Sequence, residues 1–372
     1  MTYKETLFFV GKCLTINHEK HNFEIVEEQL KSGKIDWDSV VKLSTAHYVF
    51  PALYCNLKKA EFLKYLPDDL VAYMIRIADL NRERNKQIIR QAKEINELLL
   101  TNNIKPIFLK GAGNLLEGLY HDIAERMIGD IDFIVSKEEF QQTVVVLNSF
   151  GYKKVNKTKN DYPQFKHYPR LNKEDRIAAI EIHKELLAEK HSKSFNYNYV
   201  SKETISIDQI KVLNYEHQLI NTIITKQLND HGLYLKNIIL KVAYDSFLLS
   251  KQTNVKTKDI LNNIIDFQRP INFFLALNSE VFNHPKSLYF LKNKDTISYT
   301  KDFLKLIENK SLREKNIRKV KKKATLIRRI DMSKKIFTSK THRTWFLKSI
   351  TDKEWLNEKM IEFGLKKPKP NS

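Results

Sequence analysis

Residues 105–135, KPIFLKGAGNLLEGLYHDIAERMIGDIDFIV, contain the pattern around which the rest of the chain is organised. The pattern predicts a buried strand over Ile104–Leu109, a glycine-rich turn, a helix and a second strand over Asp130–Val135. Asp130 and Asp132 are separated by one residue, and side chains alternate between the two faces of a strand. Both carboxylates are therefore expected on one face, as a divalent-metal site requires.

Further short strands are predicted after this stretch. Ser136–Glu139 has the pattern of a capping box, which predicts a helix that ends near Gly151. The strands are expected over Tyr152–Val155, Gln164–Leu171 and Ile177–His183. Together these elements predict an α+β core of about 100 residues, an ordinary size for one domain.

A third carboxylate, Glu181, lies on the last of these strands, and His183 is expected on the same face. The apolar neighbours of these residues should point the other way, into the core: Ile131, Phe133, Ile180 and Ile182. Like charges gathered on a sheet repel one another unless a cation neutralises them. A metal site explains the three acids, and so do turn capping and pairing with the abundant lysines. His183 is expected to pack or to support the site rather than to act as a base.

The regions on either side of the core are predicted to be helical. Asp36 is placed to cap a helix, Pro51 to open the next one, and Pro67-Asp68 to open a long helix that ends near Asn102. Within that long helix the stretch NRERNKQ, residues 81–87, is expected to form a solvated face. The predicted organisation is a helical domain over 1–102, the core over 103–206, a second helical domain over 207–350, and a terminal helix with a disordered tail over 351–372.

Bulk composition indicates a globular, largely helical protein. The 372 residues are 42% hydrophobic and 29% charged, with only 9 glycines and 9 prolines. No membrane span is predicted, because no run approaches about 18 consecutive apolar residues. The N-terminus lacks the features of a signal peptide, so we place the chain in the cytoplasm. Cys13 and Cys55 have no partner at metal-binding spacing and are expected as reduced, buried thiols.

The formal net charge of +20 leaves several kinds of partner open. Nucleic acid, an anionic membrane surface and a polyanionic substrate such as a nucleotide all suit a basic protein, and a solvated lysine surface suits it equally. The densest basic run is Lys310–Arg343, which could contact nucleic acid. It contains few of the aromatic side chains on which bases stack, Phe337 and the nearby Trp345.

The order of strand, glycine turn, helix and Asp-Ile-Asp strand, with an acid on a later strand, resembles the polymerase-β-like nucleotidyltransferase superfamily. FLKG at 108–111, RMIGDIDFIV at 126–135 and IEIHKEL at 180–186 resemble more closely a bacterial family of uncharacterised nucleotidyltransferases. The resemblance extends from the Trp37 region to the later helix with Asp245. It implies a small mixed-sheet nucleotidyltransferase core flanked by N-terminal and C-terminal helical domains.

The resemblance also implies a chemistry and a set of site residues. Asp130, Asp132 and Glu181 would be the catalytic acids and the ligands of two Mg²⁺ ions. Gly111 would lie against the triphosphate of an NTP such as ATP. The superfamily usually has Gly-Ser or Gly-Gly at this turn, whereas this chain has Ala112 and so lacks a hydroxyl for a phosphate.

Two cations near the glycine turn, Lys110 and Arg126, are candidates for binding phosphate. Lys110 could instead lie on the surface, and Arg126 could instead pair with an acid of the strand. The predicted reaction moves a nucleoside monophosphate from an NTP to an unidentified hydroxyl acceptor and releases pyrophosphate. The alternative is a non-catalytic nucleic-acid-binding or interaction protein that keeps the same fold.

Overall fold

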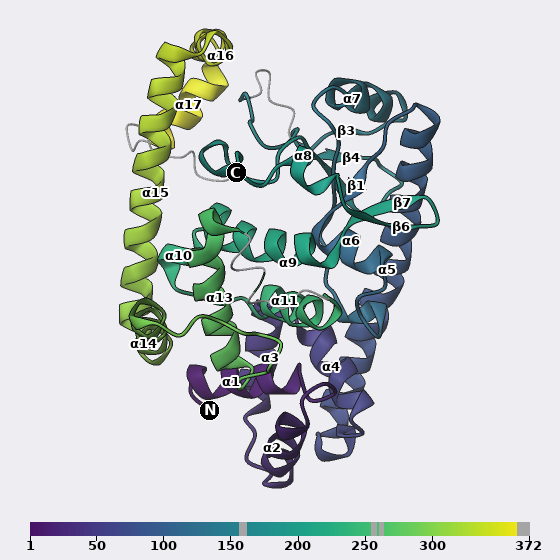
Figure 1. Cartoon of the computed structure of the whole chain (residues 1–372), viewed down its shortest axis with the longest axis vertical. Coiled ribbons are helices and arrows are strands. Elements are labelled where there is room, and N and C mark those ends of the chain that lie inside the picture. Colours follow the sequence, from purple (N-terminus) through teal and green to yellow (C-terminus); the bar gives the residue numbers. More distant parts are fainter. Residues whose placement is uncertain (156–161, 254–258, 260–263, 363–372) are drawn as a thin grey trace, which may run out of the picture.

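The computed structural model describes residues 1–155, 162–253, 259 and 264–362. The described chain has an α+β fold, as predicted, with one mixed sheet flanked by helices. Figure 1 shows the sheet on one side of the molecule and the long helix α15 (Lys310–Thr338) on the other. The first four helices lie together at the end of the molecule that carries the N-terminus.

Seven strands form the sheet. They are β1 Ile107–Phe108, β2 Asp130–Ile134, β3 Lys153–Lys154, β4 Leu171–Asn172, β5 Ala179–His183, β6 Thr204–Ile207 and β7 Ile210–Leu213. Their order is β3-β4-β5-β2-β1-β7-β6. The central strand β2 pairs in parallel with β5 and antiparallel with β1, and β1 pairs in parallel with β7. The two strands that carry the predicted acids are therefore direct neighbours.

The sheet differs from the sequence prediction in two places. The strand predicted over Gln164–Leu171 is wrong for most of its length, because β4 is only Leu171–Asn172, although His167 bridges His183. The hairpin of β6 and β7 is absent from the prediction. Its turn residues Asp208 and Gln209 have left-handed φ values of 47° and 66°, as two-residue hairpin turns require, without the glycine that usually marks them. Because β7 pairs with β1, the sheet continues past residue 206.

The N-terminal helices are α1 Tyr3–Cys13, α2 Lys20–Lys31, α3 Trp37–Ala46 and α4 Phe50–Lys59, followed by a short 3₁₀ turn, Leu63–Tyr65, and the long helix α5 Asp68–Thr101. The predicted cap is confirmed, since the Asp36 carboxylate accepts a hydrogen bond from Ser39 N at 3.1 Å. Pro51 lies in the first turn of α4, where a missing N–H costs no helical hydrogen bond. Cys13 and Cys55 are buried and free, as predicted.

Helix α5 holds the loop that leads into β2. Asn81 Nδ2 donates to Ala124 O at 2.7 Å, and Asn85 Nδ2 donates to Arg126 O at 2.7 Å. Both asparagines are buried. The prediction that residues 81–87 form a solvated face is therefore wrong for these two side chains, which satisfy backbone carbonyls that would otherwise be buried without a donor.

The remaining helices lie partly against the sheet and partly on the other side of the molecule, where α15 runs (Figure 1). They are α6 Lys110–Leu116, α7 Phe140–Ser149, α8 Tyr197–Val200, α9 Tyr215–Ile224, α10 Gly232–Leu235, α11 Leu240–Gln252, α13 Gln268–Val281, α14 Lys294–Glu308, α15, α16 Lys340–Ile350 and α17 Lys353–Glu362, with short turns at Ile123–Glu125, Glu189–His191, Thr225–Asn229 and Ile265–Phe267. In the described parts of the chain, no helix combines the length and the apolar character that a membrane crossing needs. The predicted disordered tail lies outside the described residues.

Candidate active site

The pairing of β2 with β5 brings the predicted acids to one face of the sheet. In this parallel register Asp132 lies opposite Glu181, and Ile134 lies opposite His183. The intervening residues Ile131, Phe133, Ile180 and Ile182 are fully buried, as expected for side chains on the other face. The alternation predicted for these two strands is therefore confirmed.

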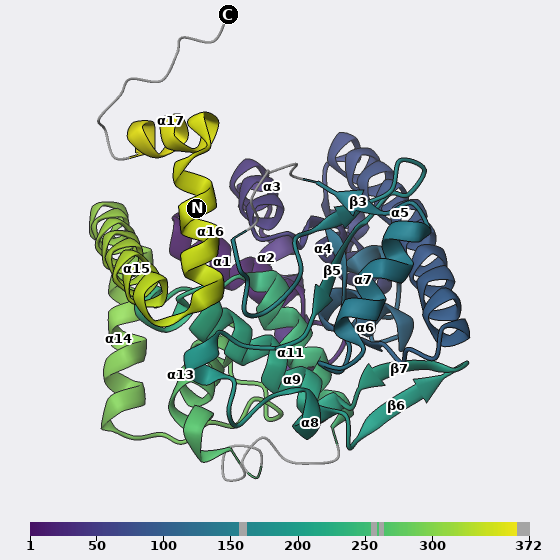
Figure 2. The same ribbon diagram turned by 90° about the horizontal axis from the view of Figure 1, so that it is seen from above.

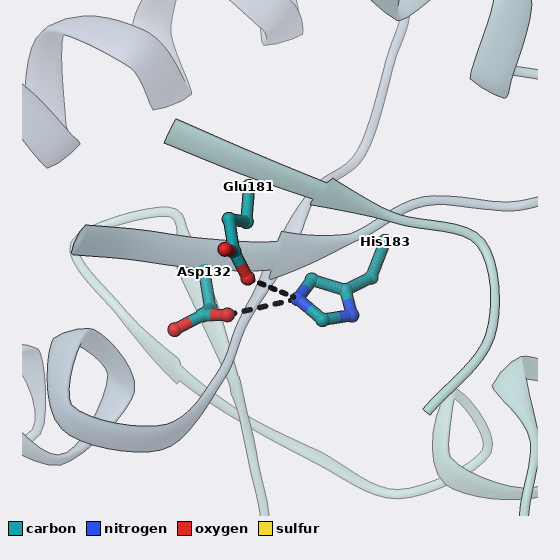
Figure 3. Close-up of side chains that lie close together, drawn as sticks. All are labelled: Asp132, Glu181 and His183. Carbon is teal, nitrogen blue, oxygen red and sulfur yellow. Dashed lines mark hydrogen bonds and ion pairs between the residues drawn. The ribbon is translucent and has the colours of Figure 1, made fainter. Parts of the chain in front are cut away.

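Asp132, Glu181 and His183 point toward one another from the two strands (Figure 3). His183 Nε2 lies 2.8 Å from Asp132 Oδ1 and 3.6 Å from Glu181 Oε2. One ligand atom from each of the three residues falls within 4.8 Å of the others. Two carboxylates and an imidazole at this spacing could hold a metal ion.

Two cations neutralise the acids in this structure. Lys110 Nζ contacts Asp132 from the start of α6. Arg170, the residue before β4, bridges the other two acids, with its Nη2 2.7 Å from Asp130 Oδ2 and 3.0 Å from Glu181 Oε1. The cluster thus combines three acids with two basic side chains. Another cation could replace these side chains as the partner of the acids.

The acids differ in how readily they ionise. Burial acts to raise the pKa of Asp132, but Lys110 and His183 outweigh burial and hold this pKa well below its usual range. The nearby imidazole of His183 is the main cause that lowers the pKa of Glu181 to about 2. Burial, followed by the charges of Asp132 and Glu181, raises the pKa of Asp130 above its ordinary value. Burial is the largest of these causes, and repulsion from the two neighbouring acids adds to it.

The glycine-rich segment forms the first turns of α6 instead of a turn before it. The chain changes direction at Lys110, which has a left-handed φ of 51°, a conformation that costs energy for a residue with a Cβ. A Cβ on Gly113 would lie 2.9 Å from Phe108 O, so only glycine lets α6 pack this closely on β1. This close packing places the Lys110 side chain beside Asp132, and Gly111 and Ala112 follow it, both buried.

The comparison with protein families identifies the family of the chain. A family model described as Uncharacterised nucleotidyltransferase matches residues 33–283, which include the whole acid cluster. The chain belongs to this family. No curated protein and no solved structure gives a match.

In this member of the family, Arg126 lies beneath α6 and away from solvent. Its Nη2 is 2.8 Å from Asp245 Oδ2, and Nη1 donates to Met127 O at 2.7 Å. Tyr120 also donates to Asp245, at 2.7 Å. A Cβ on Gly111 would lie 3.2 Å from Ile128 Cγ1, a tight contact, and 3.4 Å from the Arg126 guanidinium, so this turn of α6 packs on Ile128 and beside Arg126. Pairing with an acid, the alternative considered for Arg126, is what the structure shows, but the acid comes from α11 and not from β2.

Two further cations lie near the cluster, Lys166 and Lys241, and sequence analysis missed both of them as well as Arg170. Burial and the nearby Lys110 lower the pKa of Lys166. Burial and then Arg126 lower the pKa of Lys241 to about 8, and Asp130 is among the acids that act on it in the opposite sense. Lys166 and Arg170 stand four residues apart in a segment that lies mostly outside the sheet and bends at Lys166, so no regular pattern indicated them. Lys241 comes from α11, and no sequence signal connects it with the sheet.

Proposed function

We propose that this chain transfers a nucleoside monophosphate from an NTP to a hydroxyl acceptor in an Mg²⁺-dependent reaction that releases pyrophosphate. The observation that carries the proposal is the gathering of Asp130, Asp132 and Glu181 on one face of β2 and β5, next to the first turn of α6. Membership of a nucleotidyltransferase family supports the general chemistry.

The donor set fits a magnesium site. Carboxylate oxygens are the ligands that Mg²⁺ prefers. A divalent cation would relieve the repulsion from Asp132 and Glu181, which adds to burial in raising the pKa of Asp130. We assign two Mg²⁺ ions to Asp130, Asp132 and Glu181, with His183 beside them. Bound there, the metal would neutralise phosphate charge and lower the pKa of the acceptor hydroxyl.

The side chains around the acids would bind and orient the nucleotide. Lys110 and Arg170 carry the charge that can stabilise the phosphates as negative charge develops on the leaving group. The first backbone N–H groups of α6, at Gly111 and Ala112, have no partner within the helix and suit phosphate oxygens. Arg126 would contribute indirectly, because it supports Gly111 from below.

The proposed step forms one bond and breaks one bond. The acceptor oxygen bonds to the α-phosphorus, and the bond from that phosphorus to the bridging oxygen of pyrophosphate breaks. The hydroxyl proton leaves to a carboxylate of the cluster or to water. The chain therefore acts mainly by orientation and charge neutralisation, as in other phosphoryl transfers.

Loss of a central acid tests the proposal. Each of the four NTPs, labelled at the α-phosphate, is incubated with the protein and Mg²⁺ or Mn²⁺, and both label transfer and pyrophosphate release are measured. We expect Asp132→Ala to reduce turnover by at least about 10³-fold. Glu174→Gln removes an exposed carboxylate from the turn before β5 and serves as the matched control, with activity unchanged.

The second variant separates catalysis from folding. Asp130 is more exposed than Asp132 and pairs only with Arg170 among the described ion pairs, so Asp130→Asn should stay folded. We expect this variant to be inactive with an unchanged circular-dichroism spectrum. Equal label transfer by Asp132→Ala and the wild type would show that the acids are not catalytic. Absence of Mg²⁺-dependent NTP binding in the wild type would favour the alternative, a non-catalytic protein with this fold.

A further inference from the structure

Helix α15 carries a large positive charge that its surroundings do not neutralise. Its 29 residues include twelve Lys and Arg and two acids, and no residue of the helix is buried. Its densest cations are exposed and have no acidic partner among the residues that the structure describes: Lys319, Lys321, Lys322 and Lys323. A run of cations this dense attracts a polyanion, which carries many phosphate groups, more strongly than it attracts a single phosphate group.

The distribution of these cations distinguishes between polyanions. Lys321, Lys322 and Lys323 are consecutive and therefore point in three directions about 100° apart. A helix that lies on a membrane instead keeps its cations on one face and its apolar side chains on the other. Leu326, Ile330 and the 80%-exposed Phe337 follow the lysines on the same helix and are exposed too. Exposed apolar side chains among cations suit the unstacked bases of a single-stranded nucleic acid.

The end of α15 and the start of α16 reach the segments that lead to the acid cluster. Lys335 of α15 pairs with Glu189, six residues after His183 in the chain. In α16, the rings of His342 and Trp345 lie 5.6 and 5.0 Å from the ring of Tyr162. Figures 1 and 2 show that α15 leads directly into α16.

The segment that begins at Tyr162 leads from this contact to the site. It contains Lys166, whose backbone carbonyl accepts hydrogen bonds from Lys184 N at 3.0 Å and Glu185 N at 3.1 Å, directly after His183, and Arg170, which contacts Asp130 and Glu181. Residues 162–170 therefore connect the end of α15 and the start of α16 with the acid cluster.

We propose that α15 and residues 162–170 bind a single-stranded RNA whose terminal hydroxyl is the acceptor. This proposal rests on the proposed nucleotidyl transfer and names its acceptor class. The helix binds the phosphate backbone, Phe337 and the neighbouring aliphatic side chains contact bases, and Lys166 and Arg170 direct the end of the strand toward the acids. An RNA end supplies the hydroxyl that the reaction needs.

The test measures binding and transfer separately. Fluorescence anisotropy is recorded with a labelled single-stranded RNA of 20 nucleotides over a series of salt concentrations. Lys319, Lys321, Lys322 and Lys323 are changed together to Gln, which preserves helix propensity. The matched control changes four exposed lysines of the N-terminal region to Gln and gives the same net charge: Lys20, Lys31, Lys34 and Lys42.

We expect the α15 variant to bind RNA at least about tenfold more weakly, with a salt slope that is smaller by about 0.7 for each phosphate that the helix no longer neutralises. The control should bind as the wild type does. Equal weakening in both variants, or unchanged binding by the α15 variant, would overturn the proposal. Binding to phosphatidylserine vesicles in place of RNA, or equal affinity for single-stranded DNA, would also overturn it.

Transfer of the α-phosphate label to the RNA connects this surface with the reaction. The α15 variant should lose labelling of RNA but keep Mg²⁺-dependent NTP binding, whereas Asp132→Ala should lose labelling but keep RNA binding. If the wild type binds RNA through α15 and transfers label to no acceptor, the surface is supported and the proposed reaction fails. If it labels another acceptor and never RNA, the acceptor assignment is wrong.

Discussion

Two groups of charged side chains lie next to the first turn of α6 and differ in almost every physical respect. Lys110 belongs to the acid cluster and has a side chain that is 29% exposed. Arg126 belongs to the pair with Asp245, where the two side chains are 9% and 3% exposed. From sequence both cations were candidates for the same role, the binding of phosphate.

The difference shows which of the two groups, the Arg126–Asp245 pair or the acid cluster, has charge that its neighbours do not neutralise. Asp245 has Arg126 and the Tyr120 hydroxyl as partners, so the pair is buried, neutral and hydrogen-bonded. The cluster instead brings several acids to one partly open face, and burial and its neighbouring acids raise the pKa of Asp130. A buried charge is tolerated when its partner is present and is costly when that partner is removed. We therefore expect the pair to determine stability and the cluster to determine ligand binding.

Removal of Arg126 should have the largest effect on stability. Arg126→Met leaves Asp245 buried without its counter-charge and should lower the free energy of unfolding by about 3–5 kcal/mol in urea denaturation. Arg126→Met combined with Asp245→Asn removes both charges and keeps an acceptor for Tyr120, so most of the stability should return. A double variant that is stable but has lost NTP binding would show that Arg126 itself contacts phosphate.

Removal of Lys110 should have a smaller effect on stability and a distinct response to metal. Lys110→Met takes one cation from Asp132, which keeps its contact with His183. The decrease should be about 1.5–3 kcal/mol, the range for a hydrogen bond to a charged group. Added MgCl₂ should raise the melting temperature of Lys110→Met more than that of Arg126→Met, since a metal can reach the cluster but not the buried pair. Equal responses of the two variants would remove the distinction between them.

The acid face could be predicted from the sequence because strand alternation is a local property. Asp130 and Asp132 share a face whatever the rest of the fold does, and the short apolar runs around them identify both strands. The same argument placed Glu181 and His183 together. The pairing of β2 with β5 does not follow from alternation, because β3 and β4 lie between these two strands in the chain.

The partners of the acids could not be predicted because they come from regions without a regular pattern. Arg170 lies in a segment that is extended but mostly outside the sheet, and Asp245 lies 119 positions from its partner Arg126 on a helix of another region. The β6–β7 hairpin was missed because Asp208-Gln209 lacks the usual turn residues. Long-range pairing and unusual turn residues therefore limit what the sequence predicts, whereas the strand pattern does not.

The pH dependence of stability should separate two acids within the cluster, with opposite signs. Glu181 has a folded pKa of about 2, below its ordinary value of 4.5, so its ionisation stabilises the fold above pH 4.5 and this contribution is lost as the pH falls toward 2. Asp130 has a raised pKa, so its protonated form is favoured by folding and the corresponding stability is lost as the pH rises through that pKa.

At pH 7 without divalent metal, Glu181→Gln should therefore melt a few degrees below the wild type and Asp130→Asn at the same temperature or slightly above it. The Glu181→Gln difference should shrink between pH 4.5 and 2 in thermal melts followed by circular dichroism, while the exposed control Glu174→Gln stays level with the wild type throughout. If both variants were destabilised equally at pH 7, the acids would act as ordinary ion-pair partners, and the cluster would resemble the buried pair more closely than the geometry indicates.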